Sequence, residues 1–252
     1  MTLPRRVSAE TLDGLAEADP AAMRSRRDLQ RIHRVMGTRT ILLRALRKLA
    51  ASHPQTRPMR MLELGAGDGS LMLSVARALA GQVPQVELTL LDCQDLVSGS
   101  TLAGYAEAGW RASVQLCDVL DWSSSPADSP DGQGAPRWDL IICNLFLHHF
   151  EGVQLHALLA AIESRSNQFF ACEPRRVKLA LAASHLVGLL GANAVTREDA
   201  VLSVHAGFRG QELTRIWPQS LLGWTLEEHS AGFFSHCFLA VRSNSERAAK
   251  AL

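Results

Sequence analysis

The segment from Met61 to Ser70 constrains this chain more than any other part of its sequence. It consists of Met-Leu-Glu-Leu-Gly-Ala-Gly-Asp-Gly-Ser, an apolar run followed directly by three glycines at alternate positions. A short apolar run bounded by glycine is typical of a strand buried in a parallel sheet. Glycines suit the following turn because its backbone is tight, takes positive φ values and must let a ligand approach closely. The segment therefore predicts a buried strand, a ligand-binding turn and the start of a helix.

Short apolar runs alternate with helical stretches from residue 59 onward, which is the pattern of a parallel, doubly wound sheet. Strands are expected at residues 60–64, 86–91, 113–116, 138–143, 167–172, 224–229 and 233–241. Helices are expected at residues 70–80, 96–108, 153–163 and 210–216. Residues 123–137 are rich in Ser, Pro, Asp and Gly, and we expect them to form a disordered loop.

Helical segments flank this pattern on both sides. Residues 1–57 are expected to form an N-terminal helical segment, interrupted at Gly37-Thr38 and ended at His53-Pro54. Residues 58–252 are expected to form the α/β domain, with an insertion at about 175–218 that is helical to about residue 190 and irregular after it. We expect the two segments to close over the sheet edge as an apolar cap. Its apolar side chains would be Met23, Met36, Leu186, Leu189, Leu190, Phe208 and Trp217.

Composition and charge exclude several classes of protein. A formal net charge of +1 gives no electrostatic argument for a nucleic-acid or anionic-membrane partner. The apolar runs fall short of the roughly 18 residues of a membrane span, and no apolar region follows Arg5-Arg6 to make a secretory signal. Five cysteines without a C-x-x-C pair indicate free thiols rather than a disulfide framework or a zinc site. We expect a cytoplasmic protein, monomer or homodimer, with no metal site.

Acidic residues around the glycine turn favour a cationic ligand. The turn runs through Gly65, Ala66, Gly67, Asp68 and Gly69. A dinucleotide fingerprint, G-x-G-x-x-G, would need glycine where Ser70 stands, and the charge of Glu63 would oppose a pyrophosphate. Glu63 and Asp68 suit an ammonium or sulfonium group instead. Two alternatives stay open: the turn binds nothing, or Glu63 supports the loop without touching a ligand.

The motif E-x-G-x-G-x-G at the end of a first strand resembles motif I of the class I S-adenosylmethionine-dependent methyltransferases. Leu90-Leu91-Asp92 ends the second expected strand, about 25 residues beyond the turn, and Cys117-Asp118 ends the third. Residues 138–144 and 169–173 resemble the fourth and fifth motifs of the family. The resemblance covers roughly residues 59–173 as motifs and extends to Arg242 as topology. It implies a Rossmann-like, seven-stranded, mostly parallel sheet with helices on both faces.

The resemblance also implies S-adenosylmethionine as the cofactor, bound across the carboxyl ends of the strands. The glycine turn and Glu63 would form part of the cofactor site, and Asp92 would accept hydrogen bonds from both ribose hydroxyls. Asp118 would face the adenine amino group, with Cys117 beside it and Asn144 at the end of the fourth strand. A helix cap is the alternative role for Asp118, and Asp121 is a rival for the adenine.

His148 and His149 follow the fourth expected strand, at the edge where the transferred methyl group would lie. A histidine there can take a phenol or hydroxyl proton near neutral pH. Adjacent residues do not easily face the same site, so we expect one of the two to act and the other to cap or pack the next helix. The fourth motif lacks the Asn-Pro-Pro-aromatic signature of enzymes that methylate exocyclic amines of bases.

These features predict methyl transfer to a small, largely apolar acceptor in secondary metabolism, with O-methylation of a hydroxyl or phenol preferred. The alternatives are C- or N-methylation of a small metabolite and RNA methylation. A different class of alternative is a non-catalytic, cofactor-binding partner protein on the same fold.

Overall fold

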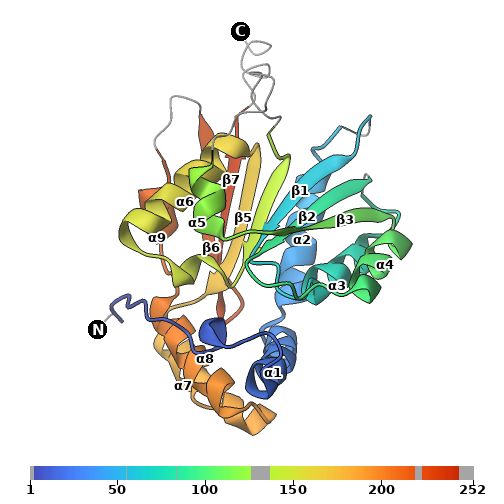
Figure 1. Cartoon of the computed structure of the whole chain (residues 1–252). Coiled ribbons are helices and arrows are strands. Elements are labelled where there is room, and N and C mark those ends of the chain that lie inside the picture. The colour runs from blue at the N-terminus through green and yellow to red at the C-terminus, as the bar shows by residue number, and fades with distance from the viewer. Residues whose placement is uncertain (1–2, 55, 84, 126–136, 219–222, 244–252) are drawn as a thin grey trace.

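The computed structural model describes residues 3–54, 56–83, 85–125, 137–218 and 223–243. Within these ranges the chain forms a seven-stranded sheet in the order β3-β2-β1-β4-β5-β7-β6 (Figure 1). The strands are β1 Met59–Leu64, β2 Val86–Asp92, β3 Trp110–Leu116, β4 Leu140–Asn144, β5 Gln168–Pro174, β6 Trp224–Ala231 and β7 Ser235–Arg242. β7 runs antiparallel to β5 and β6, and the pairs among β1 to β5 are parallel. The predicted Rossmann-like, mostly parallel sheet is confirmed.

Alternate residues of the central strand β1 enter two different apolar cores. Met59 and Met61 pack with α2 (Thr38–Ala50), α3 (Ser70–Leu79) and α4 (Gly99–Glu107). Leu62 and Leu64 pack with α5 (Val119–Ser124), α6 (Gly152–Arg165) and α9 (Glu212–Ile216). Successive side chains of a strand point to opposite faces. An apolar strand such as β1 therefore needs helices on both faces, and the carboxyl edge is left for a ligand.

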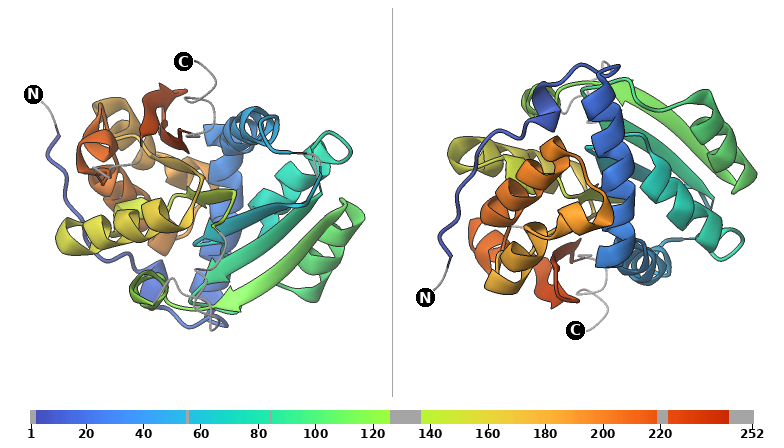
Figure 2. Two further views of the ribbon diagram at one scale, coloured as in Figure 1. Left: turned by 90° about the horizontal axis from the view of Figure 1, so that it is seen from above. Right: turned by 90° about the horizontal axis from the view of Figure 1, so that it is seen from below.

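A third group of helices lies beneath the carboxyl edge of the sheet (Figures 1 and 2). It comprises η1 (Leu12–Gly14), α1 (Pro20–Met36), α7 (Lys178–Ser184), η3 (Val187–Leu190) and α8 (Ala194–Ala206), which we call the helical cap. Buried polar groups join α1 to the start of α8: Asp28 Oδ2 accepts from the Asn193 backbone N–H at 2.9 Å, and Ser25 Oγ donates to Asn193 Oδ1 at 3.0 Å. Satisfied buried polar groups fix one geometry of packing.

The expectation of an irregular segment after residue 190 is wrong, because α8 occupies it. Asn193 begins this helix by accepting a hydrogen bond from the Thr196 backbone N–H at 2.8 Å. The side chains that α8 buries include the polar residues Thr196 and Asp199. A helix that buries polar side chains shows no apolar periodicity, so the sequence pattern missed it. Of the predicted loop at 123–137, residues 126–136 lie outside the described ranges, and residues 123 and 124 end α5.

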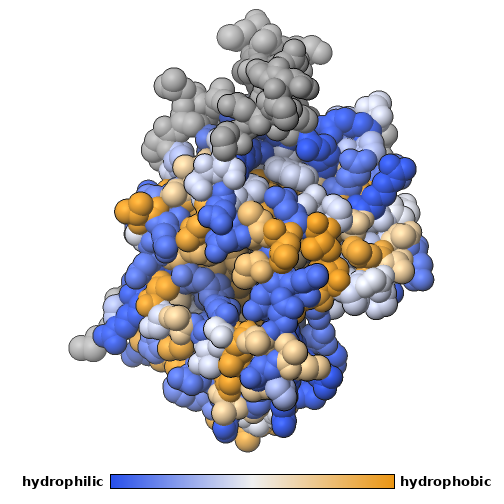
Figure 3. Space-filling model, in the orientation of Figure 1, coloured by the Kyte–Doolittle hydropathy of each residue, from blue (hydrophilic) through white to orange (hydrophobic). Residues whose placement is uncertain are grey.

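The prediction of which apolar side chains line the cap is also wrong. Phe208 and Trp217 are buried in the core, where the Trp217 ring stacks on Phe169 at 5.7 Å between centroids. Leu186 and Leu189 face solvent, and Leu189 is 84% exposed. Apolar and polar areas alternate over the face shown in Figure 3. None of the described helices combines the length and apolar character needed to cross a membrane.

Candidate active site

The glycine turn adopts backbone conformations that an L-residue rarely takes. Gly65, Gly67 and Gly69 have φ values of 66°, 56° and 69°. A Cβ atom on Gly65 would lie 2.2 Å from Cδ2 of Phe146, whereas one on Gly67 would meet nothing within 4 Å. Gly65 therefore serves close packing, and Gly67 faces space that a ligand can use. Asp92, at the end of β2, accepts from the Gly67 backbone N–H at 2.8 Å and so fixes the turn.

Two hydrogen-bond acceptors are buried beside this turn without a donor. Glu63 Oε2 and Asn144 Oδ1 have no hydrogen-bond partner within the described part of the chain. They stand near the carboxyl ends of the adjacent parallel strands β1 and β4. Burial and the nearby charges of Asp92 and Asp68 raise the pKa of Glu63 to about 8. Unpaired buried acceptors beside several acids form a site for a cation that donates hydrogen bonds.

The helical cap reaches the glycine turn through α1. Gln30 Nε2 donates to Asp68 Oδ2 at 3.1 Å and contacts Ser70 Oγ at 3.3 Å. The second carboxylate oxygen of Asp68 accepts from the Ser70 backbone N–H at 2.9 Å, at the beginning of α3. Ala66, in the middle of the turn, donates its backbone N–H to the Leu91 carbonyl at 3.1 Å. Asp68 thus holds the turn, and Gln30 is a contact that the sequence did not predict.

Asp118 caps a helix in this structure. Its Oδ1 accepts from the Leu120 backbone N–H at 2.7 Å, at the first turn of α5. The Cys117 thiol donates to the Asp118 carbonyl at 3.2 Å. Asp118 is exposed and Cys117 is partly buried, both directly after β3 on the same edge as Asp92. Asp118 therefore has the helix-capping role that was one of the two alternatives from the sequence. Its contact with the adenine stays a prediction.

A tight turn after β4 presents the two histidines. Leu145 has a φ of 50°, the only positive value for a non-glycine among the described residues, and it precedes η2 (Leu147–His149). Strained backbone of this kind persists where neighbouring groups hold it. The carboxylate of Glu173, fully buried at the end of β5, accepts from the backbone N–H groups of Phe146 at 3.1 Å and Leu147 at 2.9 Å. Glu173 therefore determines the shape of this turn.

His148 lies between two carboxylates. Its Nδ1 is 2.9 Å from Glu173 Oε2, and its Nε2 is 3.3 Å from Glu10 Oε1. Burial by itself lowers the pKa of His148, but hydrogen bonds and charge from Glu10 and Glu173 outweigh it and raise this pKa to about 9. Both ring nitrogens are thus engaged, and the imidazole is cationic at neutral pH.

His149 has a different environment. Its Nδ1 is 3.2 Å from Asp13 Oδ2, and its side chain is 22% exposed. The ring lies 4.2 Å from that of His148, centroid to centroid. A carboxylate on Nδ1 orients an imidazole and leaves Nε2 to face a reacting group. Of the two predicted histidines, His149 is the one with an available nitrogen.

The structure brings all of the predicted site residues to one edge of the sheet: Glu63, Gly65, Ala66, Gly67, Asp68, Gly69, Asp92, Cys117, Asp118, Asn144, His148 and His149. Sequence reasoning missed Glu10, Asp13, Gln30 and Glu173. Glu173 could have been found from the sequence, because an acid that ends a buried parallel strand lies at the ligand-binding edge. No sequence pattern indicates the roles of Glu10, Asp13 and Gln30, since only tertiary folding brings these side chains to this edge.

Neither a family model nor a curated protein matches this sequence. The search of solved structures finds likeness to the plantazolicin methyltransferase BpumL in complex with SAH, at 13% identity and a TM-score of 0.58, over 90% of this chain and 92% of that one. Magnesium protoporphyrin IX methyltransferase (ChlM) from Synechocystis PCC 6803 with bound SAH matches at 15% identity and a TM-score of 0.50, over 92% and 91% of the two chains. The CurJ carbon methyltransferase matches at 14% identity and a TM-score of 0.53, over 82% of this chain and 54% of that one. These likenesses establish the fold.

Proposed function

We propose that this chain, which has the fold of the class I S-adenosylmethionine-dependent methyltransferases, binds S-adenosylmethionine and transfers its methyl group to a small acceptor. The observation that carries the proposal is the pair of buried acceptors without donors, Glu63 Oε2 and Asn144 Oδ1, beside the glycine turn. An ammonium group can donate an N–H hydrogen bond to each of these two oxygens. Its positive charge is also favoured by the acids nearby. The methionine end of the cofactor provides such a group.

The rest of the cofactor fits the chemistry of the same edge. Asp92 has a carboxylate at the end of β2, where the two hydroxyls of a ribose can donate to it. A Cβ atom on Gly67 would meet no protein atom, so the ligand can lie directly against the backbone there. Asp118 and Cys117, after β3, remain our assignment for the adenine. BpumL and ChlM, which have the same fold, contain bound SAH, and this supports S-adenosylmethionine as the ligand of this chain.

We assign the acceptor atom as oxygen. S-adenosylmethionine supplies a methyl carbon on a sulfonium: the C–S bond breaks, its electron pair stays on sulfur, and an O–C bond forms. His149 receives the hydroxyl proton, because its Nδ1 is held by Asp13 and its other nitrogen is available. His148 holds the turn in place through Glu173. C- or N-methylation, RNA methylation and a non-catalytic role are the alternatives, and an acceptor screen by methyl mass shift separates them.

Binding of S-adenosylmethionine to the full chain, measured by calorimetry, tests the proposal directly. We expect a 1:1 complex that is weakened roughly 10- to 100-fold in Asp92→Ala, since hydrogen bonds to a charged group contribute about 1.5–3 kcal/mol each. The matched control is Glu87→Ala, which removes an acid at the other end of the same strand and should leave the affinity unchanged. No heat of binding to the wild-type protein would end the proposal.

The raised pKa of Glu63 predicts a pH-dependent affinity. A cation bound beside Glu63 favours the carboxylate, so affinity should increase as the pH rises toward about 8, with release of up to ~1 proton near pH 7. The α-amino group of the ligand titrates in the same range. The contribution of Glu63 is therefore the difference in proton release between wild type and Glu63→Gln. Calorimetry in two buffers of different ionisation enthalpy measures this release. Equal proton release by both proteins would contradict it.

Folding of the cofactor-free protein should show the opposite trend. The folded chain holds the Glu63 proton more tightly than the unfolded chain does, because the pKa of about 8 lies above its ordinary value of 4.5. The contribution of Glu63 to the free energy of unfolding therefore decreases as the pH rises between these values and stays constant above them. Denaturant unfolding of wild type and Glu63→Gln from pH 5 to pH 9 measures this difference.

A further inference from the structure

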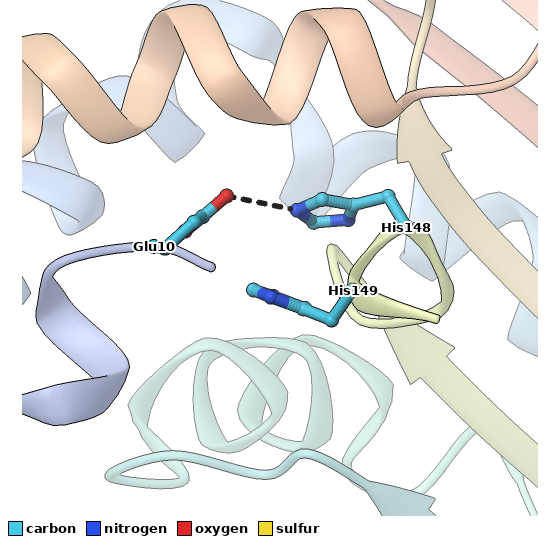
Figure 4. A group of neighbouring side chains, drawn as sticks. All are labelled: Glu10, His148 and His149. Atoms are coloured by element: carbon cyan, nitrogen blue, oxygen red, sulfur yellow. Dashed lines mark hydrogen bonds and ion pairs between the residues drawn. The ribbon is translucent and has the colours of Figure 1, made fainter. Parts of the chain in front are cut away.

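We propose that Glu10, His148 and His149 bind a divalent transition-metal ion of the zinc class. Each residue offers one ligand atom, and the three atoms lie within 4.8 Å of one another. Figure 4 shows the carboxylate of Glu10 and the two imidazole rings facing one another across a small space. Two imidazoles and a carboxylate are the ligand types that zinc binds at catalytic sites. The inference departs from the sequence-based expectation of no metal.

The spacing of the ligands fits such an ion. Glu10 Oε1 and His148 Nε2 are 3.3 Å apart. Two ligands at the zinc–nitrogen and zinc–oxygen distances of a tetrahedral site are separated by about 3.4 Å. The side chains are preformed in the interior, since those of His148 and Glu10 are only 3% and 12% exposed. Little rearrangement is therefore needed for both atoms to bind one ion.

The groups behind the ligands match those of metal sites. Metal-binding histidines usually donate their second ring N–H to a carboxylate, which fixes the ring and raises its basicity. His148 has Glu173 on Nδ1 at 2.9 Å, and His149 has Asp13 on Nδ1 at 3.2 Å. Each ring thus has a carboxylate on Nδ1; His149 keeps Nε2 for an ion, and His148 offers Nε2 once an ion displaces the proton that this atom shares with Glu10. Ser203 Oγ donates to Glu10 Oε1 and holds the third ligand.

The ligands come from two distant parts of the chain. Glu10 belongs to residues 3–13, which we call the N-terminal strap, and the histidines belong to η2 after β4. Contacts independent of any ion hold the strap in place: Arg5 Nε donates to the Ala206 carbonyl at 2.7 Å, and the Thr11 backbone N–H donates to Asp199 at 2.8 Å. An ion would join this preformed strap to the edge of the sheet.

The consequence for chemistry rests on the proposed function. Three protein ligands leave a fourth position on a tetrahedral ion, which the hydroxyl oxygen of an acceptor can fill. The ion lowers the pKa of that hydroxyl, and its proton passes to solvent. His149 then acts as a ligand, and no longer as the group that receives the proton. Metal-dependent turnover follows from this arrangement, whereas the ion-free arrangement predicts turnover in the presence of a chelator.

Titration of the chelator-treated full chain with Co²⁺, followed by visible absorption, and with Zn²⁺, followed by calorimetry, tests the site without an acceptor. We expect one ion per chain and the absorption of four-coordinate Co²⁺. Glu10→Gln and His149→Gln should each weaken binding at least 10-fold. The controls are His185→Gln and His229→Gln, which change exposed potential ligands elsewhere and should not alter binding.

Two outcomes overturn the inference: no stoichiometric binding to wild type, or binding that both Glu10→Gln and His149→Gln retain. Thermal unfolding of each variant identifies any that fails to fold, and Asp13→Asn replaces it as the test, with a smaller loss of affinity expected. Calorimetry of wild type with S-adenosylmethionine is run in parallel. If the cofactor binds and the ions do not, only the metal inference fails.

Discussion

Gly65→Ala should lower the free energy of unfolding by about 3 kcal/mol, far more than the same change at Gly67. A left-handed backbone costs an L-residue about 1–2 kcal/mol, and the new Cβ would also overlap the Phe146 ring, at 2.2 Å from Cδ2. Overpacking of this kind adds about 1–3 kcal/mol. Denaturant unfolding at constant pH measures the loss.

Gly67→Ala is the matched control. Gly67 also has a positive φ, 56°, but its Cβ would meet no atom of the protein within 4 Å. We expect only the backbone cost of about 1–2 kcal/mol. The affinity for S-adenosylmethionine should fall more than 10-fold, because the methyl group enters space that we assign to the ligand. Equal stability losses for the two variants would show that Phe146 does not pack on Gly65 as described.

Glu173→Ala should destabilise the protein by about 3–5 kcal/mol, the range for removing one partner of a buried ion pair. The substitution removes one of the two carboxylates beside the His148 cation. It also leaves the backbone N–H groups of Phe146 and Leu147 without their hydrogen-bond acceptor. Glu173→Gln keeps an acceptor for these N–H groups and should cost less. The measurement is the shift of the denaturant midpoint at unchanged slope.

Glu107→Ala is the control for Glu173→Ala. Glu107 forms an ion pair with Arg77 at 3.8 Å, and its side chain is 75% exposed. Exposed pairs at such distances contribute little, so we expect no measurable change in stability. A similarly small effect of Glu173→Ala would mean that another group supports the turn after β4.

The positions of the strands along the chain and the ligand-binding edge of the sheet were predictable from local pattern. Glycines at alternate positions after an apolar strand, and acids or cysteines at later strand ends, identify the ligand-binding edge because parallel strands all end there. Both Asp92, at the end of β2, and Glu173, at the end of β5, satisfy this rule. The helix α8 was not predictable, because its buried face contains Thr196 and Asp199 and so lacks apolar periodicity.

The sequence by itself determined the strands, the glycine turn and the acids at strand ends, since each is visible as a pattern of neighbouring residues. Only the tertiary structure distinguishes the environments of His148 and His149. Their difference comes from Glu10, Asp13 and Glu173, of which the first two lie well over 100 residues away in the sequence. Charge and hydrogen bonding act over a few ångströms in space, so the chemistry of a side chain is set by the neighbours that folding brings to it.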